Sequence, residues 1–186
     1  AELGVVRACL VLISTLSVDG GDISRYFKSA KIGTHLPQIA RSSLDDVHMT
    51  EICLSAMSSL CTGASDKKDA SVDDAEPSDA TLPPPPPVDN EVNSMDELLD
   101  GNVMSVMDVA FKNYTRSAMI MKHACIIVGQ LLAHTGSMEI VKGHDSLYRN
   151  IIFALQLHLG VKNVNRIICG CVQALAKNLN GRMQLE

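Results

Sequence analysis

Four apolar helical segments recur along this 186-residue chain at a nearly fixed spacing. Each has a reference cysteine with small or apolar residues three and seven positions later, which places one apolar stripe along a helix. The reference residues are Cys9, Cys53, Cys125 and Cys169, and Cys171 could replace Cys169 as the last anchor. The first and last intervals are both 44 residues, and the middle one is 72, which is 28 residues longer. The chain therefore reads as a repeated unit with one insertion.

A second pattern precedes the complete long segments. An amphipathic stretch opens near a glycine in each case, at Gly33, Gly101 and Gly143. Because glycine punctuates helices, we predict a break at each of them. Short helices are expected before the breaks, over residues 22–31, 95–100 and 137–142. The predicted unit is a short helix, a glycine turn, a medium helix, a loop and a long helix.

The insertion differs sharply in composition from the rest of the chain. Residues 65–100 contain eleven Asp or Glu and two Lys, a net charge of −9, whereas the other 150 residues carry +4. This segment lacks the aliphatic density that would compensate for backbone ordering. We predict a disordered insert over residues 63–93 with a stiff polyproline run at Pro83–Pro87. That run could bind a reader of proline-rich motifs, or it could serve only as a spacer.

In unit order and period the chain resembles the armadillo repeat family, and HEAT repeats are the nearest alternative. The resemblance covers nearly everything outside the insert, and the three-helix unit and glycine break favour armadillo. It implies an all-α, armadillo-like superhelical solenoid of three-helix repeats. Residues 1–62 would be the end of one repeat plus a full repeat, residues 63–93 the insert, and residues 94–186 two further repeats and the start of another.

The resemblance also implies that residues 1–18 form the third helix of a severed repeat, so the chain is expected to be a fragment. The apolar stripe of this helix would then lack a cover on one side, and the fragment should self-associate. The stripe is Val6, Cys9, Leu12, Ile13 and Leu16.

Composition and motifs exclude several classes of protein. Aromatic residues make up only 3% of the chain, which suits helix-on-helix packing of aliphatic, Met and Cys side chains. The net charge of −5 argues against nucleic-acid binding, and no apolar run reaches the roughly 18 residues of a membrane span. No catalytic motif is found, so we expect no enzyme and no cofactor. Asp45 and Asp46, near His48, are expected to cap a helix rather than to act in acid–base chemistry.

The six cysteines lie inside apolar helical patterns, as free, buried thiols do. Reduced thiols predict an intracellular, cytoplasmic protein. Cys169 and Cys171 are two residues apart on a helix and point in different directions, so no metal site is expected.

The predicted function is a non-catalytic scaffold that binds a partner protein through the groove lined by the long third helices. Importin-type armadillo proteins hold basic peptides with a recurring Trp and Asn, and neither recurs here. Polar residues off the apolar stripe are mildly basic and would suit an acidic partner segment. The alternatives are a structural subunit of a large assembly and an accessory domain of a larger enzyme, such as a ligase or exchange factor. The candidate partner-binding residues are Arg7, Lys122, His123, Gln130, Arg166, Gln173 and Lys177, with Glu51 as the acidic member of the same face.

The insert gives the first testable prediction. Replacing residues 65–92 with a short Gly/Ser linker should leave the melting temperature nearly unchanged, because closure entropy varies slowly with loop length. If the acidic tether shields a basic face, the same replacement should tighten binding of an acidic partner at low salt only. Calorimetry and a salt titration of binding measure both effects. Unfolding on replacement would place the insert in the core, and an unchanged affinity at every salt concentration would make it only a spacer.

Overall fold

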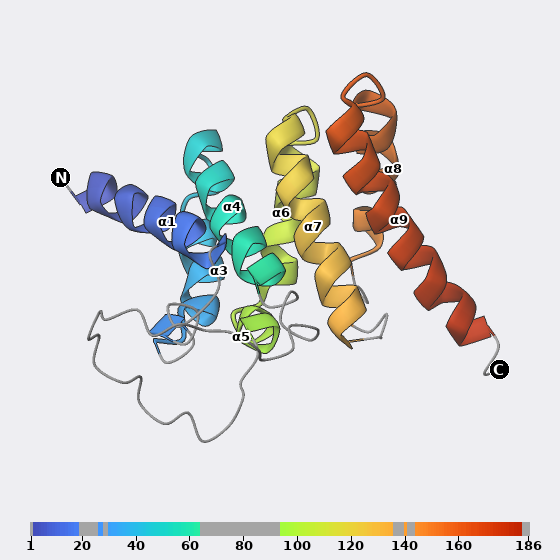
Figure 1. The fold of residues 1–186 in the computed structure, drawn as a ribbon. Helices are drawn as coiled ribbons and strands as arrows, with labels where there is room; N and C mark the ends of the chain where they lie inside the picture. Colours follow the sequence, from blue (N-terminus) through green and yellow to red (C-terminus); the bar gives the residue numbers. More distant parts are fainter. Residues whose placement is uncertain are drawn as a thin grey trace, which may run out of the picture.

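The computed structural model of this chain describes residues 2–18, 26–27, 30–63, 94–135, 140 and 144–183. These residues form eight helices and no strand, so the protein is all-α over the part described, as predicted (Figure 1). The helices are α1 (Glu2–Val18), α3 (Ile32–Ser42), α4 (Val47–Gly63), α5 (Ser94–Asp100), α6 (Val103–Asn113), α7 (Ala118–Thr135), α8 (Asp145–Leu157) and α9 (Lys162–Met183).

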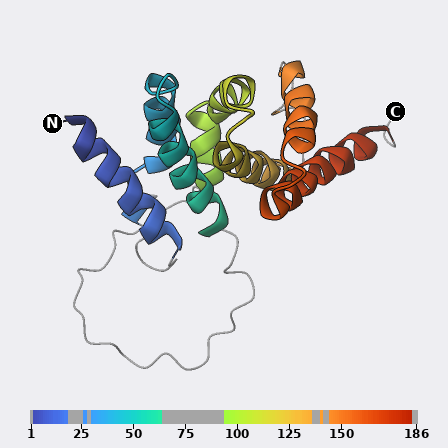
Figure 2. The ribbon, with the colours of Figure 1, turned by 90° about the horizontal axis from the view of Figure 1, so that it is seen from above.

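The four long helices form one layer. α1 packs on α4, α4 on α7, and α7 on α9, so the chain runs from α1 at one end to α9 at the other (Figures 1 and 2). The medium helices form a second layer, in which α3 packs on α6 and α6 on α8, and each also packs on its own long helix. The short helix α5 packs against α3, α4 and α6.

The pair formed by a medium and a long helix recurs at fixed offsets. α3 and α4 begin at residues 32 and 47, and α6 and α7 begin 71 residues later, at 103 and 118. α9 begins 44 residues after α7. The predicted offset of 72, taken from Cys53 and Cys125, is therefore wrong by one residue. With an offset of 71, eight of the nine buried residues of α4 align with buried residues of α7. The interval that contains the insert is therefore 27 residues longer than the 44-residue period.

Each long helix has two adjacent rows of residues. The upstream row lies on the side of the preceding long helix, and the downstream row on the side of the following one. The Cys125 thiol in the downstream row of α7 lies next to Cys171 in the upstream row of α9, so these two rows face each other. The upstream rows are Val5, Cys9, Leu12 and Leu16 in α1; Met49, Cys53, Ala56 and Leu60 in α4; Ile120, Ala124, Ile127 and Leu131 in α7; and Val164, Ile168, Cys171 and Leu175 in α9. The downstream rows are Val6, Leu10, Ile13 and Ser17 in α1; Thr50, Leu54, Met57 and Cys61 in α4; Met121, Cys125, Val128 and Leu132 in α7; and Asn165, Cys169, Val172 and Ala176 in α9.

The rows explain where the cysteines lie. All six are free, and Cys53, Cys61, Cys125 and Cys171 are buried as predicted. Burial raises the pKa of Cys53 to about 11 and that of Cys61 to about 12. Cys9 and Cys169, predicted to be buried, are exposed. Cys9 is in the upstream row of α1 and Cys169 in the downstream row of α9, and no described helix covers either row.

Neighbouring units are also joined by hydrogen bonds at equivalent loop positions. Tyr114, which follows α6, donates its hydroxyl proton to the Leu44 carbonyl oxygen in the loop after α3. His158, 44 residues later and following α8, places Nε2 2.7 Å from the Thr115 carbonyl oxygen. Each bond connects a medium helix's C-terminal end to the preceding unit, so the loop geometry repeats along with the helices.

Of the predicted glycine turns, the one at Gly101 is confirmed, because Gly101 lies between the end of α5 and the start of α6, and the one at Gly33 is wrong. The residues with left-handed backbone are Lys31 (φ 49°) and Asn102 (φ 58°), which precede α3 and α6 at equivalent positions. Gly33 lies inside α3 instead, and a Cβ there would be 2.6 Å from the Glu97 Cβ of α5. A Cβ on Gly101 would be 2.7 Å from the Thr34 carbonyl oxygen. Both glycines therefore permit close approach of α3 and α5.

A buried carboxylate joins α5 to α3 at this contact. Glu97 is only 3% exposed, and its Oε2 accepts a hydrogen bond from the Gly33 backbone N–H at 3.0 Å. This N–H lies in the first turn of α3, where Lys31 supplies no side-chain cap. Because the first N–H groups of a helix lack intrahelical partners, Glu97 acts as a cap contributed from the other side of the insert.

Other expectations have mixed outcomes. The short helix predicted at 95–100 is confirmed as α5. Of the helix predicted at 22–31 only residues 26–27 and 30–31 are described, and of the one predicted at 137–142 only residue 140 is. Gly143 and residues 64–93 of the insert lie outside the described residues. Gly63, which the sequence assigns to the insert, belongs to α4, and α9 continues to Met183. α7 spans 18 residues and is apolar enough to cross a membrane by length and composition alone, but half of it is buried inside the protein, as in a core helix.

The contact between α3 and α5 gives a stability prediction. Gly33→Ala should lower the free energy of unfolding by about 1–3 kcal/mol, because the methyl group overlaps Glu97. Gly170→Ala, on an exposed helical position with no atom within 4 Å, should instead raise it by up to about 1 kcal/mol. Urea denaturation of both variants measures the difference. Equal effects of the two substitutions would show that α5 does not approach α3 this closely.

Candidate functional site

The predicted partner-binding residues all lie on the long helices. Arg7, Glu51, Lys122 and Arg166 each follow the first residue of a downstream row, so they occupy the same position in α1, α4, α7 and α9. We call these four residues the charged column. Arg7 and Arg166 are exposed, and Glu51 and Lys122 are partly buried. Gln173 and Lys177 are exposed two and three turns beyond Arg166 on α9, and Gln130 is partly buried two turns beyond His123 on α7.

Polar contacts between consecutive long helices lie beside the buried rows. The Arg7 guanidinium of α1 donates to His48 Nε2 of α4. Two turns further along α1, the hydroxyl oxygen of Ser14 lies 3.1 Å from that of Ser55 and 3.3 Å from that of Ser59, both in α4. His48 itself lies in the first turn of α4, where Asp46 Oδ1 accepts the backbone N–H groups of His48 and Met49. Asp46 is therefore a helix cap, as expected.

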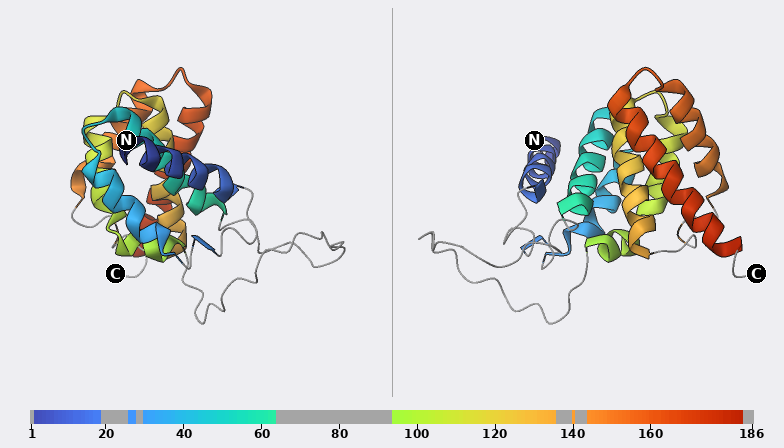
Figure 3. Two further views of the ribbon diagram at one scale, coloured as in Figure 1. Left: turned by 90° about the vertical axis from the view of Figure 1, so that its left-hand side faces the viewer. Right: turned by 45° about the vertical axis from the view of Figure 1, so that its right-hand side comes forward.

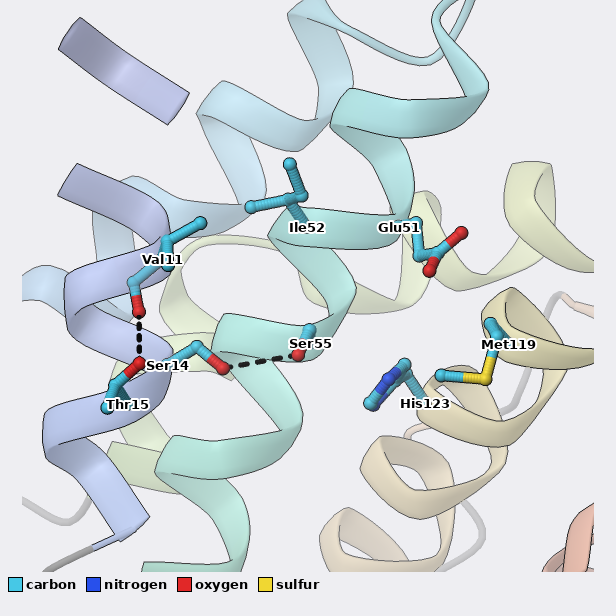
Figure 4. Close-up of a pocket in the computed structure, with 8 residues that line it drawn as sticks. All are labelled: Val11, Ser14, Thr15, Glu51, Ile52, Ser55, Met119 and His123. Carbon is cyan, nitrogen blue, oxygen red and sulfur yellow. Dashed lines mark hydrogen bonds between the residues drawn. The ribbon is translucent and has the colours of Figure 1, made fainter. Parts of the chain in front are cut away.

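An open hollow of about 210 Å³ lies between α1, α4 and α7 (Figure 4). Its wall combines apolar side chains, hydroxyl groups and one carboxylate. The lining residues are Val11, Ser14, Thr15, Glu51, Ile52, Ser55, Met119 and His123. Of the candidates named from sequence, Glu51 and His123 line this hollow. The hydroxyl residues and Met119 were missed, because they are identified only once the two rows of each long helix are known.

His123 differs most from its predicted role. It is only 9% exposed, and its Nδ1 lies 2.7 Å from the Ser58 hydroxyl oxygen. Burial, and secondarily the charge of Lys122, lower the pKa of His123 from 6.5 to about 4. The imidazole is therefore neutral near pH 7. The prediction that it adds positive charge to a basic face is wrong.

The Ser58–His123 pair is arranged for packing rather than for nucleophilic chemistry. Ser58 donates its hydroxyl proton to the Ser55 carbonyl oxygen at 2.9 Å. Because a hydroxyl has a single proton, His123 must supply the proton of the Ser58–His123 bond through Nδ1–H. The imidazole then cannot accept the serine proton at Nδ1, and Ser58 is itself only 4% exposed.

The chain was compared with known protein families, curated proteins and solved structures. A scan of protein-family models, a search of curated proteins and a search of solved structures find no match to this chain. Within the described ranges, no group of three or more His, Cys, Asp or Glu side chains could hold a metal ion.

The buried imidazole gives a pH prediction. Between pH 6.5 and 4 the unfolded chain binds a proton at His123 that the folded protein does not, so the free energy of unfolding falls as the pH is lowered through this window. The contribution at pH 5 is about 2 kcal/mol relative to pH 7. His123→Gln, which keeps an N–H donor but does not titrate, should reduce the pH dependence by that amount. Urea denaturation at both pH values tests this, and equal losses for the two proteins would contradict it.

Proposed function

We propose that this protein is a non-catalytic interaction scaffold of the armadillo-like solenoid type, which binds an extended segment of a partner protein across the exposed side of its long helices. The single observation that carries the proposal is the charged column. Arg7, Glu51, Lys122 and Arg166 occupy one position in four consecutive long helices, 44, 71 and 44 residues apart. A stacked array of helices offers equivalent positions at regular intervals, which suits a linear ligand.

The spacing of the column suggests the form of the ligand. Packed helices lie about 8–10 Å apart, and an extended chain advances about 3.3 Å per residue, so about three partner residues separate adjacent column positions. Acidic side chains would face Arg7, Lys122 and Arg166, and a basic side chain would face Glu51. Three cations and one anion give the column a net positive charge, so an acidic segment with one basic residue is the best complement.

The hollow adds a contact for a side chain between these positions. Glu51 lies at its edge, and Val11, Ile52 and Met119 provide apolar surface. The stem of a partner's Lys or Arg could cover that surface while its head reaches Glu51. The six free cysteines support a location in a reducing compartment inside the cell.

A structural role in a larger assembly is the second candidate. It is favoured by the exposed apolar side chains of α1, since Val5 and Leu12 are 63% and 57% exposed and a neighbouring subunit could bury them. A pull-down from native lysate separates the two candidates. A scaffold should capture its partner at variable stoichiometry, whereas an assembly subunit should capture its neighbours at fixed stoichiometry.

Charge reversal in the column tests the binding proposal. The triple variant Arg7→Glu, Lys122→Glu, Arg166→Glu should lose at least about tenfold in affinity for the bound partner, because three attractive contacts become repulsive. The matched control is Lys112→Glu, Arg149→Glu, Lys162→Glu, which removes three exposed cations outside the column. Quantitative mass spectrometry of proteins captured by each form, followed by titration with a peptide from the captured partner, gives the comparison. Equal losses for the two triple variants would indicate attraction to net charge rather than a site.

A further inference from the structure

A row of apolar side chains is exposed along α8 and the loop that follows it. Phe153 and Leu157 are one helical turn apart on α8 and are 52% and 44% exposed, and Val161, in the loop before α9, is 44% exposed. Arg149 is exposed one turn before Phe153, and Lys162 is exposed at the start of α9, directly after Val161. We call these five residues the α8 row. It combines three apolar side chains with a cation at each end.

The packing of neighbouring units does not cover the equivalent positions. Asn113, the equivalent of Leu157 in the unit of α6 and α7, is exposed although α8 packs against α6. The same holds in the unit of α3 and α4, where α6 packs against α3. There the equivalents of the three apolar residues are all exposed, and they are Gln38, Ser42 and Asp46. The α8 row is therefore exposed because of its place in the repeat, and not because of what stands beside α8.

The chemistry of these positions is what sets the α8 row apart. Of the six equivalent residues in the other two units, five are polar, and the sixth, Val109, is partly buried. The repeat therefore folds without apolar side chains at these positions. An exposed cluster of apolar side chains with polar neighbours is typical of a binding surface.

Two other exposed apolar residues of this unit do not belong to the row. Ile152 and Leu159 are 45% and 64% exposed, and their equivalents 44 residues earlier are Asp108 and Thr115. Asp108 accepts a hydrogen bond from α8, and the Thr115 carbonyl oxygen is bonded to the loop after α8. Because these positions contact a following unit, the exposure of Ile152 and Leu159 indicates no ligand.

The charge of this unit has a single sign. Residues 146–185 contain no Asp or Glu, and their five charged side chains are all Arg or Lys, although the whole chain has a net charge of −5. The loop equivalent to the one after α8 carries two carboxylates in the first unit, Asp45 and Asp46. α5, the described part of the acidic stretch, lies at the opposite edge of the helical layers from the loop between α8 and α9 (Figures 1 and 3). An anionic surface that approached this unit would meet cations and no carboxylate.

We propose that the α8 row binds the surface of an anionic membrane. Phe153, Leu157 and Val161 would enter the boundary between headgroups and acyl chains, and Arg149 and Lys162 would contact the anionic headgroups. A helix lying in the membrane plane binds by this combination, because its apolar side chains leave water while its cations are attracted to the lipid charge. The row does not line the hollow between α1, α4 and α7, and it shares no residue with the charged column. The proposal is therefore independent of the scaffold function.

A fluorescent reporter tests whether the row reaches the membrane. The chain has no Trp, so one introduced Trp reports its own surroundings. The emission of Phe153→Trp should shift to shorter wavelength, and be quenched by brominated acyl chains, when phosphatidylcholine vesicles containing about 30% phosphatidylserine are added. Vesicles of phosphatidylcholine alone should cause neither change. Val47→Trp is the matched control, because Val47 is 50% exposed at the position equivalent to Lys162, next to the acidic loop.

The apolar contribution is tested with residue types that the repeat already uses at these positions. The triple variant Phe153→Gln, Leu157→Asn, Val161→Ser should bind the anionic vesicles at least about tenfold more weakly, because the lost apolar side chains no longer leave water. Cosedimentation with the vesicles measures the affinity. Circular dichroism checks that the helices remain, and retention of the fold is expected because each new side chain occurs at an equivalent position of another unit.

The cationic contribution is tested separately. Arg149→Gln, Lys162→Gln should weaken vesicle binding at low salt, and the difference from the unchanged protein should shrink as salt screens the charges. The matched control is Lys112→Gln, Arg116→Gln, which removes two exposed cations from α6 and the loop after it. This control should bind the vesicles as the unchanged protein does.

Each outcome decides the proposal. Binding that requires phosphatidylserine, shifts the emission of Phe153→Trp and is lost in the triple variant supports it. No binding to the anionic vesicles at low salt overturns it. Binding that the triple variant retains, or equal emission shifts for Phe153→Trp and Val47→Trp, also overturns it, because another surface then makes the contact. If the vesicles leave the emission unchanged and an amphipathic helical peptide with Glu on its polar face shifts it, the row binds a protein segment and the membrane proposal fails.

Discussion

The contact between each long helix and the next is the constraint on which the rest of this structure depends. A long helix with two adjacent apolar rows exposes one of them unless a neighbour covers each side, and burying one Leu, Ile or Met side chain contributes about 1.5–3 kcal/mol. α4 and α7 have neighbours on both sides and bury both rows completely. The direct side-chain hydrogen bonds between long helices, such as those of Ser14 with Ser55 and Ser58 with His123, lie beside these rows and fix the register of apolar surfaces that already attract each other.

The same stacking determines what the exposed side can do. Once the facing rows of neighbouring long helices are buried against each other, the next residue along each helix surface takes an equivalent position in every long helix. Arg7, Glu51, Lys122 and Arg166 form a column for this reason and not through any contact among themselves. The insert does not disturb the column, because α5 returns the chain to the layer through Glu97 and Gly33. A loop whose two ends are held in this way can vary in length at little cost in closure entropy.

Sequence alone was sufficient for the helical class, the 44-residue spacing and the helices over residues 1–18 and 95–100, because apolar periodicity reports them directly. It failed across the insert for a definable reason. Cys9 and Cys53 lie in upstream rows, whereas Cys125 and Cys169 lie in downstream rows. Each 44-residue interval therefore joins two cysteines in equivalent rows. The interval from Cys53 to Cys125 joins an upstream row to a downstream row, so it is one residue longer than the true offset of 71. A small apolar thiol fits either row, so the pattern could not distinguish them. The burial of His123 was missed for a related reason. Its neighbour Lys122 suggests a polar helix surface, but His123 is one position further around α7 and its imidazole contacts Ser58.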